Sequence, residues 1–377
     1  MKKVLFYPLA VIALLACFSC SKKNTVTGRF DGFEGDSLQV QVFDFNNART
    51  ALQTLKVPVV NGDFAFDLAD STVRRVMISD PAAEGRPRGA SLTYVPGERA
   101  EIGGRLDSVV VGGTKFYQDA KAYDDLCAED QAGIKAISAE INAAAQDDAK
   151  RDSLLNIYGG FYEHITEITK DFIKSNPASL FGTTLLTRLI GKDGKDALEA
   201  LENIPESVKE GVMKPVVDKA RAGAEKTKAR VEAAEFVKDG MQAPDFTLKN
   251  EKGEDFALSS IFNQGKYIIL DFWGEWCYWC KKGIPDMKQL YKDAKGRIEI
   301  LSIDCGDTEE VWKKAIADHE LPWLHVYNPG EDKNDLAVTY AIQGYPTKVI
   351  LNPDGTINKT VIGEEPEFYD YVKSLLK

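Results

Sequence analysis

Residues 267–282 read Y-I-I-L-D-F-W-G-E-W-C-Y-W-C-K-K and decide the fold of the C-terminal part of the chain. The apolar run Tyr267–Leu270 has the length and residue types of a buried strand. After Cys280, apolar residues such as Met287 and Leu290 recur at helical spacing. The sequence therefore predicts a strand that leads through two cysteines directly into a helix.

The two cysteines, Cys277 and Cys280, stand where such a helix would begin. Free N–H groups and the positive end of the helix dipole favour a thiolate at Cys277. Cys280 lies one turn further on, close enough to attack a mixed disulfide formed by Cys277. We therefore interpret the pair as a redox-active disulfide.

The pair has two other interpretations, a zinc site and a structural disulfide. A zinc site needs a second Cys or His pair at ligand spacing, and His164, His319 and His325 stand isolated in the sequence. A purely structural disulfide would close too short a loop to stabilise much. We therefore expect no metal and no cofactor.

The segment Asp271–Cys280 resembles the active site of thioredoxin, and the region from residue 238 to the end resembles the TlpA/ResA-type thiol–disulfide oxidoreductases of bacterial envelopes. The resemblance implies an α/β thioredoxin fold over residues 238–377 and disulfide exchange on envelope proteins. The other matching segments, in chain order, are Ala243–Leu248, Gly265-Lys266, Ile300–Asp304, Gly344–Thr347 and Asn352–Gly355.

The resemblance also implies roles for individual residues. Cys277 would be the nucleophile and Cys280 the resolving thiol. Asp271, on the buried side of its strand, would have a raised pKa and would accept the proton of the second thiol. The alternative is an aspartate that merely ends the strand. Tyr345-Pro346 would be a cis peptide facing the cysteines.

The sequence departs from the family pattern at two places. Tyr278-Trp279 stands between the cysteines where a proline is usual, and Gly283 stands where a glutamate is common. We therefore hypothesise that Asp271 carries the proton transfer alone. No histidine lies between the cysteines, which favours a reductase over a strong oxidant. The predicted substrate groove comprises Trp276, Tyr278, Trp279, Tyr345 and Pro346, with Trp273 and Glu275 shaping its rim.

Residues 1–20 are predicted to be a lipoprotein signal peptide with its lipidation site. A positive start precedes an apolar stretch too short to span a bilayer comfortably. Cys17 is favoured for lipidation because Leu14 and Ala16 precede it, and Cys20 is the alternative. A plain secretory signal or an uncleaved anchor would also fit. All these interpretations place the mature chain outside the cytoplasm, and the favoured one predicts a periplasm-facing lipoprotein of the cell envelope.

Localisation outside the cytoplasm affects how the thiols are used. Spare thiol pairs tend to be oxidised there, so a reductase needs an electron donor, here an unidentified one in the membrane. Cys127 falls on a helical pattern and is most simply a buried apolar residue, whereas Cys305 follows a predicted strand. The net charge of −11 provides no basic face, and we expect no nucleic-acid partner.

The rest of the chain divides by pattern into an all-β domain over residues 24–113 and a helical region over 114–237. Alternating apolar residues predict short strands, and Asn61-Gly62 marks a turn between Leu55–Val60 and Phe64–Leu68. This part resembles, more loosely, a β domain of unknown function that precedes thioredoxin domains in Bacteroidetes lipoproteins. Apolar residues at helical spacing continue through Gln131–Asp152, with breaks expected at Asn176-Pro177 and Pro205.

Two other functions compete with the oxidoreductase. A thiol peroxidase shares the opening Ala243–Leu248, but the residues before Cys277 lack the expected Pro-x-x-x-Thr-x-x-Cys context. A binding or scaffold lipoprotein would carry the two cysteines incidentally. Reduction of insulin by dithiothreitol separates the enzyme from the scaffold, and peroxide consumption identifies the peroxidase.

Overall fold

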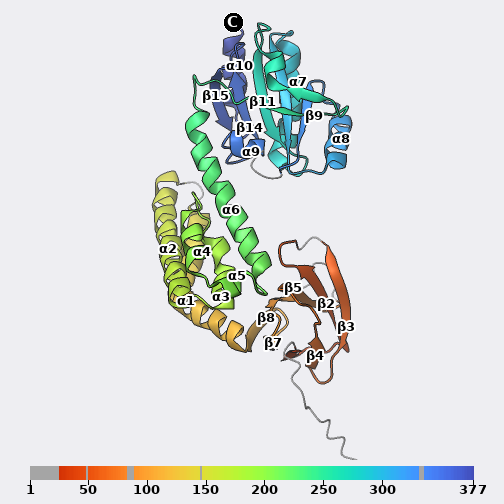
Figure 1. The fold of residues 1–377 in the computed structure, drawn as a ribbon, viewed down its shortest axis with the longest axis vertical. Helices are drawn as coiled ribbons and strands as arrows, with labels where there is room; N and C mark the ends of the chain where they lie inside the picture. Colours follow the sequence, from red (N-terminus) through yellow and green to blue (C-terminus); the bar gives the residue numbers. More distant parts are fainter. Residues whose placement is uncertain (1–24, 48–49, 83–88, 145–146, 331–334) are drawn as a thin grey trace, which may run out of the picture. The chain divides into compact units, whose positions relative to one another are not determined.

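The computed structural model describes residues 25–377 except 48–49, 83–88, 145–146 and 331–334 (Figure 1). The predicted signal segment, with both candidate lipidation cysteines Cys17 and Cys20, lies outside the described residues. The described chain forms two compact units. The first holds the residues up to Leu185 with Asn203–Asp218, and the second holds Leu186–Glu202 with Lys219–Lys377.

The N-terminal part of the first unit is built of strands, as predicted. Its strands are β1 Thr25–Arg29, β2 Ser37–Asp44, β3 Ala51–Pro58, β4 Asp63–Asp67, β5 Arg74–Ser79, β6 Gly89–Tyr94, β7 Ala100–Arg105 and β8 Ser108–Gly113. They make two four-stranded sheets, in the orders β4-β1-β7-β8 and β3-β2-β5-β6. Alternate residues Leu38, Val40 and Val42 of β2 are buried, which explains the period-two apolar pattern of the sequence.

The turn at Asn61-Gly62 is present, but it does not join paired neighbours in one sheet. Both residues have positive φ, and Val60 and Asp63 exchange backbone hydrogen bonds across the turn. β3 then pairs with β2, whereas β4 pairs with β1 of the other sheet. The turn chemistry is local and could be predicted, but the choice of partner strand depends on contacts such as Phe64 against Phe30.

Helices follow from residue 115, as the sequence predicts. They are α1 Lys115–Ala143, α2 Asp148–Ser175, α3 Leu180–Thr184, the short 3-10 helix η1 Leu185–Leu189, α4 Lys195–Asn203, α5 Glu206–Lys209, α6 Lys214–Ala233 and η2 Ala234–Phe236. The breaks at Asn176 and Pro205 are confirmed. The pattern over Gln131–Asp152 is not one helix, because Asp147 accepts a hydrogen bond from Lys150 N and caps a new helix, α2.

The C-terminal part is an α/β fold built around one mixed sheet. Its elements are β9 Thr247–Asn250, β10 Asp255–Ala257, η3 Leu258–Ile261, β11 Tyr267–Trp273, α7 Tyr278–Asp293, β12 Ile298–Cys305, α8 Glu309–Asp318, β13 Leu324–Asn328, α9 Leu336–Thr339, β14 Thr347–Leu351, β15 Ile357–Ile362 and α10 Pro366–Leu375. The strand order is β10-β9-β13-β12-β11-β14-β15. β11 is an interior strand that runs parallel to β12 and antiparallel to β14.

Both faces of β11 are buried, which explains its continuous apolar run. Ile269 and Trp273 pack in a core with residues of α7 and α10, among them Met287 and Phe368. The intervening residues, such as Leu270, pack in a second core on the opposite face. Because side chains alternate along a strand, Asp271 shares the face of Ile269 and Trp273 and lies in the layer between the sheet and helices α7 and α10.

Candidate active site

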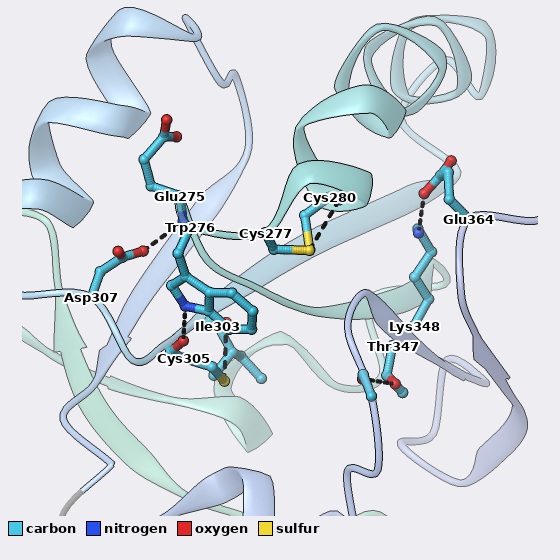
Figure 2. Close-up of a disulfide and its surroundings, with 11 residues drawn as sticks. Glu275, Trp276, Cys277, Cys280, Ile303, Cys305, Asp307, Thr347, Lys348 and Glu364 are labelled. Carbon is cyan, nitrogen blue, oxygen red and sulfur yellow. Dashed lines mark hydrogen bonds and ion pairs between the residues drawn. A yellow bond between two sulfur atoms is a disulfide. The ribbon is translucent and has the colours of Figure 1, made fainter. Parts of the chain in front are cut away.

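The two cysteines lie where the interior strand β11 passes into helix α7. Cys277 is the N-cap residue of α7, and Cys280 lies in its first turn. Their sulfur atoms form a disulfide with an S–S distance of 2.06 Å (Figure 2). The backbone N–H of Cys280 donates a hydrogen bond to Cys277 Sγ across 3.1 Å. The strand-to-helix arrangement expected from the sequence is therefore present, with the sulfur of Cys277 at the helix N-terminus.

This placement favours an ionised sulfur at Cys277 once the disulfide is reduced. The Cys280 N–H is one of the donors that an α-helix leaves unpaired in its first turn, and the helix dipole adds positive potential there. Both cysteine residues are nearly buried, with 5% and 7% of their surfaces exposed. A thiolate in such a position is stabilised by the backbone instead of by water.

Asp271 lies in β11 on the helix-covered face of the sheet. Its Oδ2 accepts a hydrogen bond from Ser302 Oγ at 2.9 Å, and Ser302 in turn accepts one from Trp323 Nε1 at 2.8 Å. Burial raises the pKa of the Asp271 carboxyl, while Lys348 and the Ser302 hydrogen bond oppose the rise and Glu364 adds to it. A carboxyl with a raised pKa can hold and release a proton closer to neutral pH than an exposed aspartate.

A buried ion pair lies beside Asp271 and was missed by the sequence interpretation. Lys348 stands directly opposite Asp271 across the β11–β14 pairing, and its Nζ lies 2.7 Å from Glu364 Oε2. The two side chains of the pair are only 3% and 10% exposed. Tyr369 donates a hydrogen bond to the other carboxylate oxygen of Glu364. The available signal was a lysine inside the apolar strand Thr347–Leu351, because a buried cation needs a partner.

Three aromatic side chains surround the disulfide on the outside. Trp276, Tyr278 and Trp279 are 56%, 68% and 53% exposed, although large aromatic rings are usually buried. Trp276 is held in place by a hydrogen bond from its Nε1 to the carbonyl of Cys305 (Figure 2). The Tyr278 and Trp279 rings pack edge to face, and Lys282 Nζ lies 4.6 Å from the centre of the Trp279 ring. The rings therefore form an ordered apolar surface next to Cys277.

The peptide bond between Tyr345 and Pro346 is cis, as the family resemblance implies. The Tyr345 ring packs edge to face on Trp276 with centres 5.2 Å apart, so this segment borders the cysteine loop. Cys305, on the adjoining strand β12, is a buried thiol, and burial raises its pKa to about 12. A thiol with such a pKa stays protonated at neutral pH and is a poor nucleophile.

The loop before Cys277 is held by charged side chains. The backbone N–H of Glu275 donates to Asp307 Oδ2 at 2.6 Å. The Glu275 carboxylate contacts Lys281 at 3.1 Å and His319 Nε2 at 2.9 Å. Trp273, predicted at the rim of the groove, is instead buried in the core, because it lies on the same face of β11 as Ile269.

Neither a membrane span nor a metal site is found in the described part of the chain. Among the residues that the structure describes, no helix is both long and apolar enough to cross a bilayer. Over the same ranges, no three His, Cys, Asp or Glu side chains are grouped so that they could hold a metal ion.

Comparison with known proteins gives matches to the C-terminal part. A family model described as thioredoxin-like matches residues 265–357. The thiol–disulfide oxidoreductase ResA of Bacillus cereus is 30% identical over 127 residues, which is 33% of this chain and 70% of the relative. ResA of Bacillus subtilis is 30% identical over 141 residues, covering 37% of this chain and 76% of the relative.

Solved structures from Bacteroides species also match. The thioredoxin domain of a thiol–disulfide oxidoreductase from Bacteroides vulgatus is 28% identical, with 37% of this chain and 99% of that chain covered and a TM-score of 0.34. A thiol–disulfide oxidoreductase from Bacteroides fragilis is 31% identical. The match covers 36% of this chain and 98% of that chain, with a TM-score of 0.33.

Proposed function

The chain belongs to the ResA-type thioredoxin-like thiol–disulfide oxidoreductases, and from that premise we propose that it reduces disulfides of envelope proteins through Cys277 and Cys280. The observation that supports this most strongly is the position of Cys277 at the N-terminus of α7, with the Cys280 N–H directed at its sulfur. The substrate is a protein disulfide, and the reaction needs no bound cofactor.

The proposed reaction has two exchange steps. The Cys277 thiolate attacks one sulfur of the substrate disulfide, which forms a mixed disulfide and releases the other substrate sulfur as a thiolate. Cys280 then loses its proton to Asp271 and attacks Cys277 Sγ, so that the substrate leaves as a dithiol and the Cys277–Cys280 disulfide forms. The substrate gains two electrons, and a membrane donor returns two electrons to the cysteine pair.

Catalysis of insulin reduction by dithiothreitol tests this function directly, and consumption of hydrogen peroxide by the reduced protein would point to a peroxidase instead. The reduction potential of the Cys277/Cys280 couple tests the direction. A value of roughly −270 mV fits a reductase such as thioredoxin, and a value of roughly −120 mV fits a strong oxidant such as DsbA.

We further propose that the aromatic side chains Trp276, Tyr278 and Trp279, with Tyr345 and Pro346, form the groove that receives the substrate chain. Large exposed rings at the reactive sulfur gain free energy by burial against an apolar segment of an unfolded or partly folded protein. Such a surface discriminates between a polypeptide and a small disulfide, because only the polypeptide covers the rings.

Replacing Trp279 with alanine is expected to raise KM for a protein disulfide about tenfold, which corresponds to ~1.4 kcal/mol. The rate with oxidised glutathione should stay within about twofold, since a small disulfide covers little of the ring. Val311→Ala on α8 removes a side chain of similar exposure away from the cysteines and serves as the control. Equal losses with both substrates would contradict the groove.

We also propose that the mature chain is a lipoprotein facing the periplasm, with residues 24–113 and 114–237 forming a spacer or docking region for the thioredoxin-like domain 238–377. Labelled palmitate should be incorporated into the native chain and into Cys20→Ser, but not into Cys17→Ser. The reverse pattern would move the lipid to Cys20, and an unlabelled native chain would contradict the anchor.

A further inference from the structure

A row of polar side chains crosses the apolar layer beneath helix α7. Strand register places Ser302, Asp271 and Lys348 side by side on adjacent strands β12, β11 and β14. All three share the sheet face that packs against α7 and α10, where directly opposite residues have Cβ atoms about 5 Å apart. Asp271 therefore has a cation as its nearest cross-strand neighbour on one side and a hydroxyl on the other.

Lys348 is nevertheless paired with a different carboxylate. Its Nζ contacts Glu364, in the turn between β15 and α10, and the ring of Phe368 lies 5.2 Å away. Within the described residues no ion pair joins Lys348 to Asp271. Asp271 instead accepts a hydrogen bond from Ser302. One lysine thus lies between two carboxyls, and the geometry assigns its closest contact to Glu364.

The Glu364 carboxylate also reaches the helix that carries the cysteines. A Cβ atom added at Gly283 would lie 2.3 Å from both Cδ and Oε2 of Glu364, so the carboxylate takes the space of a side chain at residue 283. Gly283 lies three residues after Cys280, on the same face of α7 one turn further on. Tyr369, which donates to Glu364, also lies 3.4 Å from the Gly283 carbonyl. Figure 2 shows the Lys348–Glu364 pair on one side of the disulfide and Trp276 on the other.

We propose that Glu364 is a positioning residue for the second exchange step: it holds the Lys348 ammonium and so leaves Asp271 able to take up and release the proton of Cys280. The inference rests on the proposed role of Asp271, which still carries the proton alone, and adds a residue that keeps the Lys348 ammonium away from it. The glutamate that the sequence lacks at residue 283 is supplied in space by a residue from the other end of the domain.

The electrostatic reason is a competition for one cation. Lys348 lowers the pKa of Asp271, and Glu364 raises it, on top of the larger rise caused by burial. Ser302 on β12 donates a hydrogen bond to Asp271, and Tyr369 on α10 donates one to Glu364. Burial, Glu364 and Asp286 on α7 all raise the pKa of Tyr369. Without Glu364, Lys348 would turn to Asp271 and hold it ionised, which makes it a weaker base.

The test compares Glu364→Gln with Lys348→Gln in a single turnover. The reduced protein reacts with Ellman's reagent, and Cys277 releases the first thionitrobenzoate while Cys280 releases the second. The pH midpoint of the second release should move down by about one pH unit in Glu364→Gln and up by about one in Lys348→Gln. The midpoint of the first release should stay unchanged in both variants.

Two further variants separate this tuning from simple damage to the fold. Glu299→Gln breaks the comparable Lys266–Glu299 ion pair, 2.9 Å long in the same domain, and should leave the second midpoint unchanged. The double variant Glu364→Gln/Lys348→Gln removes both charges of the ion pair together, and its midpoint should lie between those of the single variants. It also tests the proposal if a single variant fails to fold.

The result that overturns the inference is a loss of rate at all pH values with no displacement of the midpoint, or displacement in the same direction in both single variants. Failure of the proposed role of Asp271 as the base would give a different result. If Asp271→Asn keeps the pH dependence of the second release, Asp271 is not the base. If Asp271→Asn removes that dependence but Glu364→Gln does not move the midpoint, only the role of Glu364 is lost.

Discussion

Replacing Cys277 with serine is expected to reduce insulin turnover by roughly a thousandfold or more, to the level of the uncatalysed reaction. The hydroxyl of serine does not ionise at neutral pH, and the helix N-terminus that stabilises a thiolate has no sulfur to act on. Turnover is measured with dithiothreitol as the reductant and the native chain as reference.

Cys280→Ser is expected to give a different failure from Cys277→Ser. Cys277 can still attack, but no second thiol lies in the first turn of α7 to release the substrate. The mixed disulfide should accumulate and be visible as a covalent adduct on non-reducing gels. Cys277→Ser should form no adduct.

Cys305→Ser is the matched control for the two cysteine variants, because this thiol is buried and its pKa is raised to about 12. It should keep native turnover and form no adduct. Full turnover by Cys277→Ser, or an adduct that requires Cys305, would refute the assignment of the nucleophile.

Replacing Asp271 with asparagine should slow the second exchange step by about a hundredfold to a thousandfold, the usual range for loss of a positioned acid or base. Asparagine keeps the shape of the side chain and can still accept a hydrogen bond from Ser302 Oγ, but it cannot take up the proton of Cys280. The first exchange step should keep its rate, so the loss appears in the release of the second thiol.

The same variant should be more stable than the native chain at neutral pH. Burial raises the pKa of Asp271 in the folded state, so the folded chain binds this proton more tightly than the unfolded chain does. The native free energy of unfolding therefore falls as pH rises from the unfolded pKa to the folded one, by about 1.4 kcal/mol for each pH unit between them. Asparagine does not titrate and removes this loss.

Asp304→Asn is the matched control, because Asp304 is also an aspartate with a raised pKa but has no part in the proposed reaction. Burial raises the pKa of Asp304 to about 8 from 3.8, so this residue also costs stability as pH rises through that window. Unfolding by urea should show both variants more stable than the native chain at slightly alkaline pH, with the difference disappearing at acid pH, and turnover should be lost only in Asp271→Asn. Native turnover by Asp271→Asn would contradict its role as the base.

Much of the site could be predicted because its core is contiguous. Cys277 and Cys280 are three residues apart, and the strand before them and the helix after them follow from local apolar spacing. Trp273 was misplaced at the groove rim, since the alternation of β11 puts it beside Ile269 in the core. The turn at Asn61-Gly62 was found, but not that its two strands enter different sheets.

The sequence by itself determined the thioredoxin-like fold, the cysteine pair and the buried aspartate, since strand period, helix spacing and a motif of ten residues are local properties of a chain. Only the tertiary structure decided which charges meet Asp271. Lys348 reaches it through strand pairing, and Glu364 reaches Gly283 from the turn before α10. Those contacts join segments far apart in the chain, and in the dry layer under α7 one misplaced charge would alter both stability and proton transfer.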